Sequence, residues 1–428
     1  MSSTPLAKPG QLPVAIVGGG QAGLSMSRHL QDAGIEHRVF ERKRCFCEWR
    51  EARWDSFCLV TPNWQCRLPG YRYTQEYGGR DPQGFMSRDE ILRYLEGFRA
   101  SFDPPVLEGV EVQRLRPAAG GFLLQTSAGE WLAEQVVIAN GVYAKPVIPR
   151  SAERLPADIL QLHSSNYRNP QSMPEGAVLV VGSGQSGCQI AEDLHLAGRE
   201  VHLSVGSAPR SPRVYRGREV TEWLTESGYY DIPVERHPQG EAVRDKTNHY
   251  LTGRDGGREI DLRRRALEGM KLYGRFLEVS GRTLHFAPDL QHKLDQADAS
   301  YNNIRALVDQ YIASAGIDAP VEPPYVPPWA PAQEITELDY VSAGIRSIVW
   351  AIGYRADYAW IDLPVFNGRG QPVHRRGVTP VPGVYFLGLS WQNTWGSGRF
   401  ADVGQDAAYL LDHVRAWSGR EQAESCTV

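Results

Sequence analysis

The chain of 428 residues is long enough for two or three domains, each with a sizeable core. Its net charge of −4 and its 22% of charged residues give no basic surface for nucleic acid or for an anionic membrane. No apolar run approaches the roughly 18 residues of a membrane-spanning helix, and the six cysteines follow no regular spacing, so we expect a cytoplasmic protein without a membrane span.

The first strong pattern is an apolar strand, a glycine-rich turn and a helix. Val14–Val17 is followed by Gly18, Gly20 and Gly23, which have the G-x-G-x-x-G spacing of a dinucleotide-binding turn. The first glycine permits the tight bend, the second lets a pyrophosphate approach the backbone, and the third lets helix and strand pack closely. The next strand ends in Glu41, a carboxylate that accepts hydrogen bonds from a ribose with free hydroxyls. We therefore expect FAD or NAD here, with a ligand-free glycine turn as the alternative.

The following elements are a helix, a meander of strands, and a buried strand after which the chain crosses to another domain. Apolar residues at helical spacing predict a helix over residues 89–102, and the pattern predicts strands at 110–115 and 121–127. The buried strand that contains Gln135 then runs into a segment with glycine and proline. Ser347–Ile361 has the same form, which indicates two matching crossings between domains.

A second strand, turn and helix repeat the first unit 164 positions later. Val178–Val181 corresponds to Val14–Val17, and Val201–Val205 corresponds to His37–Glu41. The matching turn residues are Gly182, Gly184, Gln185 and Gly187, which correspond to Gly18, Gly20, Gln21 and Gly23. One chain therefore contains two complete dinucleotide-binding units.

The second unit lacks the acidic residue of the first. Val205 stands where Glu41 stands in the first copy, and the loop after it contains Ser207, Arg210 and Arg213. Guanidinium groups bind phosphate and a carboxylate would repel it, so this loop suits a 2′-phosphate. The sequence thus predicts NADPH rather than NADH at the second turn. The alternative is that the arginines only solvate a loop.

The order of these elements predicts an α/β fold with two Rossmann-like dinucleotide-binding domains, the NADPH domain being inserted into a discontinuous FAD domain. We expect residues 1–145 and 345–428 to form the FAD-binding domain and residues 146–344 to form the NADPH-binding domain. The charged stretch at about 225–315 belongs to neither turn, and we expect a helical or lid insertion there.

This arrangement resembles the flavin-containing monooxygenase superfamily. The likeness spans about Leu12 to Arg415. The segments "RWDSFCLVTPNWQCRLPGY", "GFMSRDEILRYL", "GRDGGREIDLRRRALEGMKLYG" and "GLSWQNTWGSGRFADVGQDAAYLL" are most similar to the flavin-dependent oxidoreductases encoded in nitrilase gene clusters. The resemblance implies an enzyme that reduces FAD with NADPH and uses a C4a-hydroperoxyflavin to oxygenate a small organic metabolite, nitrogen-containing metabolites being among the candidates.

The resemblance also implies roles for individual residues. Asn63 would hydrogen-bond the flavin hydroperoxide, and Trp64 and Gln65 would line the same pocket. A turn residue after Pro62 is the alternative for Asn63, and an aromatic loop at a domain seam is the alternative for the segment around Trp395. The residues expected to contact FAD are Gly18, Gly20, Gln21, Gly23, Glu41, Arg42, Trp49, Arg50, Asn63, Trp64, Trp395 and Arg399. Those expected to contact NADPH are Gly182, Gly184, Gln185, Ser186, Gly187, Ser207, Arg210 and Arg213.

Departures from the superfamily pattern leave other reactions open. The linker keeps His163 and Tyr167 of the monooxygenase signature, but Ala157 and Ile159 replace its Phe and Gly. A flavin dehydrogenase or oxidase without oxygen insertion, and a non-catalytic nucleotide-binding subunit, are the alternatives. No Cys-x-x-Cys supports a disulfide reductase, and no cysteines or histidines stand at zinc spacing, so no metal is expected. The expected partners are a small-molecule substrate and dioxygen, not nucleic acid, with a homodimer left open.

Overall fold

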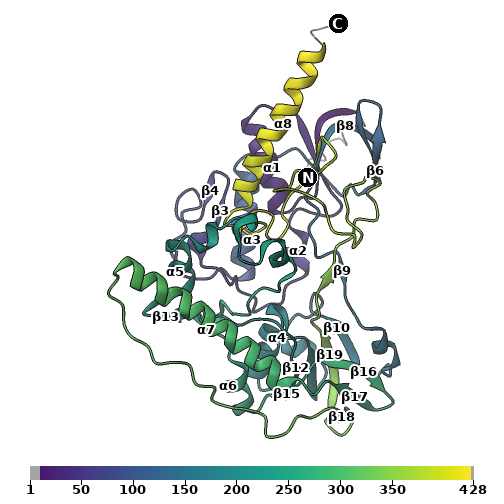
Figure 1. Cartoon of the computed structure of the whole chain (residues 1–428). Coiled ribbons are helices and arrows are strands. Elements are labelled where there is room, and N and C mark those ends of the chain that lie inside the picture. The colour runs from purple at the N-terminus through teal and green to yellow at the C-terminus, as the bar shows by residue number, and fades with distance from the viewer. Residues whose placement is uncertain (1–9, 426–428) are drawn as a thin grey trace.

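The computed structural model describes residues 10–425, with side chains for residues 10–417. Two large β-sheets, one for each glycine-rich unit, lie in the upper and lower halves of the molecule, and β9 lies between them (Figure 1). The α/β class and the two dinucleotide-binding units are therefore confirmed. Cys45, Cys47, Cys58, Cys66 and Cys188 are free thiols, and Cys426 lies outside the described residues.

The first sheet has seven strands in the order β5-β2-β1-β8-β7-β6, with β21 beside the C-terminal half of β8. Its strands are β1 (Gln11–Val17), β2 (His37–Glu41), β5 (Val106–Glu108), β6 (Val112–Ala118), β7 (Gly121–Thr126), β8 (Gly129–Ile138) and β21 (Val384–Phe386). Five strands are parallel, and β6, β7 and β8 form the expected antiparallel meander. Ile16 packs under the helices while Ala15 packs on the opposite side, so both faces of the sheet are buried.

The second sheet has five parallel strands in the order β10-β19-β11-β12-β15. These are β10 (Leu160–His163), β11 (Ala177–Val181), β12 (Val201–Ser204), β15 (Lys271–Tyr273) and β19 (Ile345–Trp350). Val178 pairs with Val201 just as Val14 pairs with His37, so the 164-residue repeat extends to the pairing register. The two units are structural copies.

One predicted boundary is wrong. We expected the FAD-binding domain to resume at residue 345, but β19 is hydrogen-bonded between β10 and β11 in the second sheet. The reason is the repeat itself, because β19 stands beside β11 as β8 stands beside β1. The chain crosses between the halves at β9 (Lys145–Pro146) and β20 (Tyr354–Arg355), which pair with each other.

Helices cover the sheets and fill the periphery. They are α1 (Gln21–Asp32), α2 (Cys47–Glu51), α3 (Arg88–Ala100), α4 (Gln185–Leu196), α5 (Val220–Glu226), α6 (Leu262–Leu267), α7 (Leu290–Ala315) and α8 (Val403–Ser425). In Figure 1, α8 rises at the top near α1, and α7 lies along the lower half. The helix expected at 89–102 is therefore present as α3.

The stretch at 225–315 is more than a helical insertion. It contains α6 and α7, but also β15, the edge strand of the second sheet. Two further strands in it, β16 (Phe276–Ser280) and β17 (Thr283–Phe286), form an antiparallel sheet with β18 (Glu337–Asp339). Their apolar residues Val279 and Leu284 pack against Leu179 of β11, so this part completes the second domain. Two short antiparallel pairs complete the strands. They are β3 (Arg67–Leu68) with β4 (Tyr71–Arg72), and β13 (Val214–Tyr215) with β14 (Arg218–Glu219).

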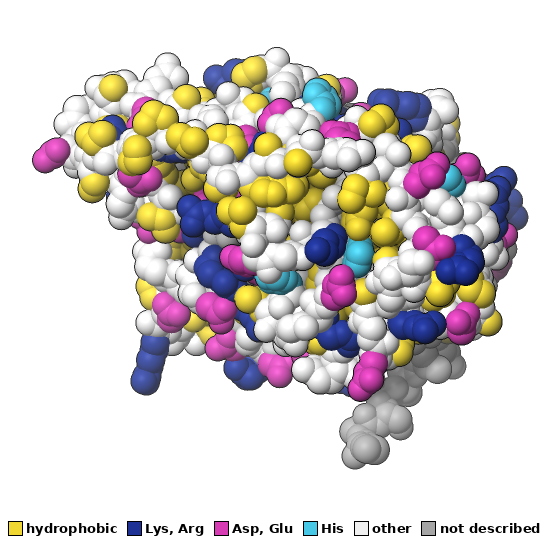
Figure 2. Space-filling model, turned by 90° about the horizontal axis from the view of Figure 1, so that it is seen from below, with side chains coloured by type: hydrophobic (Ala, Val, Ile, Leu, Met, Phe, Trp, Pro, Cys, Tyr) yellow, Lys and Arg dark blue, Asp and Glu magenta, His cyan; other side chains and the backbone are white. Residues whose placement is uncertain are grey.

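The surface of the lower half carries charges of both signs. Lysine and arginine side chains alternate with aspartate and glutamate side chains over the face seen in Figure 2. Within residues 10–425, no helix has the length and apolar character needed to cross a membrane.

Candidate active site

The first glycine turn has the three environments that a dinucleotide cradle requires. Gly18 has φ +115°, and a Cβ there would lie 2.4 Å from the carbonyl oxygen of Ala139. A Cβ on Gly23 would lie 1.9 Å from the oxygen of Gly18. A Cβ on Gly20 would meet nothing within 4 Å, because this residue faces open space. The outer glycines therefore close the turn and the middle one leaves room for a pyrophosphate.

The second turn reproduces the first. Gly182 has φ +103°, and a Cβ there would lie 2.6 Å from the oxygen of Ala351, the residue after β19. A Cβ on Gly187 would lie 1.8 Å from the oxygen of Gly182, whereas Gly184 again has nothing within 4 Å. Each turn opens a helix, α1 or α4, whose N-terminal N–H groups favour an anion. The chain's own backbone thus fits a diphosphate at both places.

Glu41 is held beside the first turn by its own hydrogen bonds. Its Oε2 accepts from Gly19 N at 2.7 Å, and its Oε1 accepts from Lys43 N at 2.9 Å. The side chain is buried yet lines the first cavity, where a ribose bound to this turn would meet a carboxylate. At the equivalent place in the second unit, Val205 lines the second cavity with an apolar side chain.

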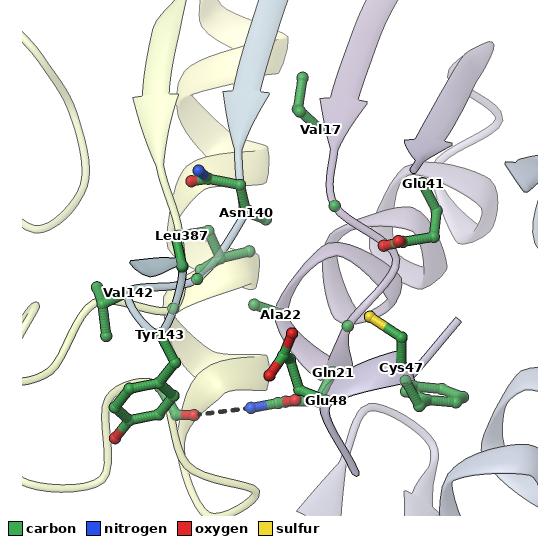
Figure 3. Close-up of a pocket in the computed structure, with 18 of the residues that line it drawn as sticks. Val17, Gln21, Ala22, Glu41, Cys47, Glu48, Asn140, Val142, Tyr143 and Leu387 are labelled. Atoms are coloured by element: carbon green, nitrogen blue, oxygen red, sulfur yellow. Dashed lines mark hydrogen bonds between the residues drawn. The ribbon is translucent and has the colours of Figure 1, made fainter. Parts of the chain in front are cut away.

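A cavity of about 330 Å³ lies over the first turn, and one of about 690 Å³ lies over the second. Figure 3 shows the first cavity, with Glu41 on one side and Asn140 and Leu387 on the other. Gln21 lies between them and donates from Nε2 to Gly398 O at 3.3 Å (dashed line). Seven residues line both cavities: Gln21, Trp49, Arg53, Tyr143, Asn248, Gly398 and Arg399. The two spaces therefore share one wall.

The shared wall is built from both halves of the molecule. Trp49 Nε1 donates to Gln21 Oε1 at 3.3 Å, and the indole packs on Phe400 with ring centres 5.3 Å apart. Arg399 Nη2 donates to Asn248 Oδ1 at 2.6 Å, which joins the loop before α8 to the second domain. Burial lowers the pKa of the Arg399 guanidinium. Aromatic rings and hydrogen bonds thus position the residues where the cavities meet.

Most of the turn residues predicted from the sequence line a cavity. They are Gly18, Gly20, Glu41 and Arg42 for the first, Gly182, Gly184, Gln185, Ser186 and Ser207 for the second, and Gln21, Trp49 and Arg399 for both. Gly23 and Gly187 pack beneath the turns, as expected for the third glycine.

Asn63, Trp64 and Gln65 form a short 3₁₀ helix outside both cavities. Asn63 Nδ2 donates to Asp81 O at 2.9 Å, and its Oδ1 accepts from Met86 N at 2.8 Å. Both ends of the amide are thus bonded to backbone, and the side chain is buried. The expectation that Asn63 and its neighbours face the flavin is not met, and Asn63 instead organises the loop that precedes α3.

Arg210 and Arg213 also point away from the second cavity. Arg210 Nη1 donates to Asp298 Oδ1 at 2.8 Å and lies 3.4 Å from Asp261 Oδ2. Arg213 donates to Glu219 Oε1 at 2.9 Å and to two backbone carbonyls. Both side chains are buried and neutralised by carboxylates. The prediction that they bind a 2′-phosphate is therefore wrong, because sequence spacing did not reveal which way they point.

Two further predicted contacts are displaced. Arg50 pairs with Glu96 of α3 and does not line a cavity. Trp395 does not line a cavity, and its indole stacks on Tyr230 with ring centres 3.8 Å apart. The Arg399 guanidinium lies over the Trp395 ring, 4.4 Å from the ring centre. Trp395 thus packs the seam between the C-terminal loop and the second domain, which is the alternative stated for this segment.

Several lining residues were not predicted. Arg53, Tyr143 and Asn248 belong to the shared wall, and Arg275 and Lys293 line the second cavity. Arg53 follows the Trp49-Arg50 step by only three residues, so its position near the first site could have been suspected. Arg275 and Lys293 had no such signal, because they lie about 70 to 90 residues beyond Val205 in sequence.

The only cysteine among the lining residues of these two cavities is Cys47. Burial raises the pKa of its thiol to about 11, so the reactive thiolate is disfavoured at neutral pH. A dithiol beside the flavin, which a disulfide reductase needs, is not present in the described part of the chain.

Two dinucleotide cradles that open onto one wall define a flavin- and pyridine-nucleotide-dependent oxidoreductase. Residues 15–266 match the model of the pyridine nucleotide-disulphide oxidoreductases, and the chain belongs to this family. The cofactors of this class are FAD and NADPH, and the two turns supply one site for each.

Comparison with known proteins supports the same class. The chain is 32% identical to an uncharacterized CzcO-like oxidoreductase of Geobacillus kaustophilus, over 94% of this chain and 97% of that protein. It is 28% identical to the probable indole-3-pyruvate monooxygenase YUCCA3 of Arabidopsis thaliana, over 48% of this chain and 49% of that protein. Its fold is similar to that of a flavin-containing monooxygenase from Stenotrophomonas maltophilia, with a TM-score of 0.63, 19% identity and coverage of 95% and 99%. The resemblance to the flavin-containing monooxygenase superfamily is therefore confirmed.

Proposed function

We propose that the protein is an FAD-dependent monooxygenase that oxidises NADPH and oxygenates a small organic molecule. The observation that carries the proposal is the shared wall, because it brings a ligand of the second turn next to a ligand of the first. The first turn would hold FAD and the second would hold NADPH, and the two cofactors together would supply flavin reduction and the activation of dioxygen. Relatives and neighbours with monooxygenase names support this reaction.

The residues of this chain provide an environment suited to that chemistry. Trp54, Phe57, Leu59 and Phe400 line the second cavity together with Trp49. With both nucleotides bound, these apolar side chains would limit the access of water to the space beside the shared wall, and an oxygenated flavin needs such protection against collapse to hydrogen peroxide. The Arg399 guanidinium, held in place by its hydrogen bond to Asn248 Oδ1, supplies a hydrogen-bond donor at the same place.

The nucleotide preference follows from charge. Asp and Glu side chains are absent from the lining of the second cavity, which includes Arg53, Arg275, Lys293 and Arg399. The first cavity, in contrast, is lined by Glu41, the carboxylate suited to an unphosphorylated ribose. We assign FAD to the first turn and NADPH to the second. The substrate, a homodimeric state, the cytoplasmic location and the nitrilase-cluster branch stay predictions.

Rapid-mixing absorbance spectroscopy tests the reaction. The purified protein is reduced with NADPH without oxygen and then mixed with oxygenated buffer. The proposal predicts a transient oxygenated-flavin spectrum before the oxidised spectrum returns. A direct return to oxidised flavin would indicate the dehydrogenase or oxidase alternative, and no reduction by either nicotinamide nucleotide would indicate a non-catalytic subunit.

A further inference from the structure

The C-terminal ends of β12 and β15 meet at the second cavity. Val205 N donates to Tyr273 O at 2.8 Å, so the two parallel strands stay paired up to the loop that replaces the acidic residue. Ser204 Oγ accepts from Phe276 N at 2.9 Å, which folds the turn after β15 onto the end of β12. Arg275 lies in this turn and lines the same cavity as Val205. A residue remote in sequence is thereby placed beside the second unit's ribose position.

Lys293 is brought to the same turn by Asp289. Asp289 Oδ1 accepts from Arg275 N at 2.9 Å, and its carbonyl oxygen accepts from Lys293 N at 2.9 Å. Lys293 lies in the first turn of α7, where the helix dipole disfavours a cation, so helix stability does not explain it. Its side chain lines the second cavity, as do those of Arg275 and Ser207.

These two cations differ from the arginines that the sequence suggested. Arg210 and Arg213 are buried against carboxylates. Arg275 is exposed, Lys293 is half-buried, and among the described residues neither has a carboxylate oxygen within ion-pair distance. The lining of the cavity contains no acidic side chain. Two free cations thus stand beside the position where Val205 replaces a ribose-binding acid.

We propose that Arg275 and Lys293, with the Ser207 hydroxyl, bind the 2′-phosphate of NADPH and set the selectivity of the second site. A guanidinium can donate two hydrogen bonds to a phosphate, and an ammonium adds a positive charge beside it. A ribose 2′-hydroxyl carries no charge and would form no ion pair with either side chain. The proposal rests on the proposed function only in taking a phosphorylated dinucleotide as the electron donor. It does not depend on the reaction with oxygen.

Calorimetric titration of the FAD-loaded protein with 2′,5′-ADP and with 5′-AMP tests the assignment without turnover. Wild-type protein should bind 2′,5′-ADP at least about tenfold more tightly than 5′-AMP. The Arg275→Ala/Lys293→Ala variant should bind 2′,5′-ADP about 10- to 100-fold more weakly and 5′-AMP unchanged. The charge-preserving variant Arg275→Lys/Lys293→Arg should retain most of the affinity.

Arg282→Ala is the matched control, because Arg282 lies in the adjacent β16–β17 turn, pairs with Asp339 and does not line the cavity. It should leave both affinities unchanged. Undiminished binding of 2′,5′-ADP by the double alanine variant, or equal loss of both ligands, would overturn the assignment. Equal binding of the two ligands by wild-type protein would overturn the NADPH preference itself. Failure of oxygen insertion, in contrast, would appear only in the rapid-mixing experiment.

Discussion

At the scale of single residues, the glycines of each turn have unlike surroundings despite their common spacing. Gly23 touches the backbone of Gly18, whereas Gly20 borders open space within the first cavity. The backbone of Gly20 has φ −83°, which any residue adopts. The fold therefore requires glycine at position 23, whereas at position 20 only a ligand bound to the turn would require it.

This difference predicts that one alanine substitution lowers folding stability and the other lowers the affinity for FAD. Gly23→Ala should lower the free energy of unfolding by about 2–4 kcal/mol, because its Cβ has no room beside Gly18 O. Gly20→Ala should leave the stability of the apoprotein within about 0.5 kcal/mol and weaken FAD binding about tenfold or more, because its Cβ enters the ligand's space. Denaturant unfolding of the apoproteins and FAD titration measure the two quantities. Wild-type FAD affinity in Gly20→Ala would contradict the assignment of the first turn.

Much of the site was predictable at this scale, since the turn residues and Glu41 follow from spacing within one unit. The cations proposed for the 2′-phosphate were not predictable, because a spacing does not tell whether a side chain points into a cavity or into a buried ion-pair network. Arg210 meets Asp298 of α7, and no local sequence signal predicts that contact. Arg275 reaches the cavity through the pairing of β12 with β15, and Lys293 reaches it because Asp289 at the start of α7 accepts a hydrogen bond from Arg275 N.

At the scale of elements, the strands and helices were largely predictable, but the partner of one strand was not. A buried strand that runs into a glycine turn describes both β8 and β19, and only the pairing shows that each flanks a different glycine unit. The 3₁₀ helix at Asn63–Gln65 is a second example. Pro-Asn predicted either a turn or a flavin contact, and the structure shows the hydrogen-bonded turn.

The loop role of Asn63 predicts a stability defect without a change in chemistry. Asn63→Ala leaves Met86 N and Asp81 O without their partner, so the free energy of unfolding should fall by about 1–3 kcal/mol. The share of consumed oxygen released as hydrogen peroxide should equal that of the wild type. Thermal unfolding and a peroxide assay at a temperature where the variant is folded measure these effects. Asn303→Ala, an exposed change on α7, is the control, and unchanged stability with raised peroxide release would instead support a flavin contact for Asn63.

At the scale of the whole molecule, the two units are copies whose cradles open onto one shared wall. The crossings β9 and β20 pair with each other, and His163 Nε2 lies 3.1 Å from Gly353 O beside them. The first domain contributes Trp49 and Arg399 to the wall, and the second contributes Asn248. Neither domain alone forms the wall at which two bound dinucleotides would meet. Electron transfer between the two ligands is therefore the central claim.

Anaerobic rapid mixing of the FAD-loaded protein with NADPH tests that claim most directly. The account predicts that the flavin absorbance bleaches and that NADH acts more slowly. Deuterium at the carbon of NADPH that donates the hydride should slow the bleaching, because a nicotinamide bound at the second turn would meet the flavin at the shared wall. Flavin that stays oxidised in the presence of NADPH would contradict it.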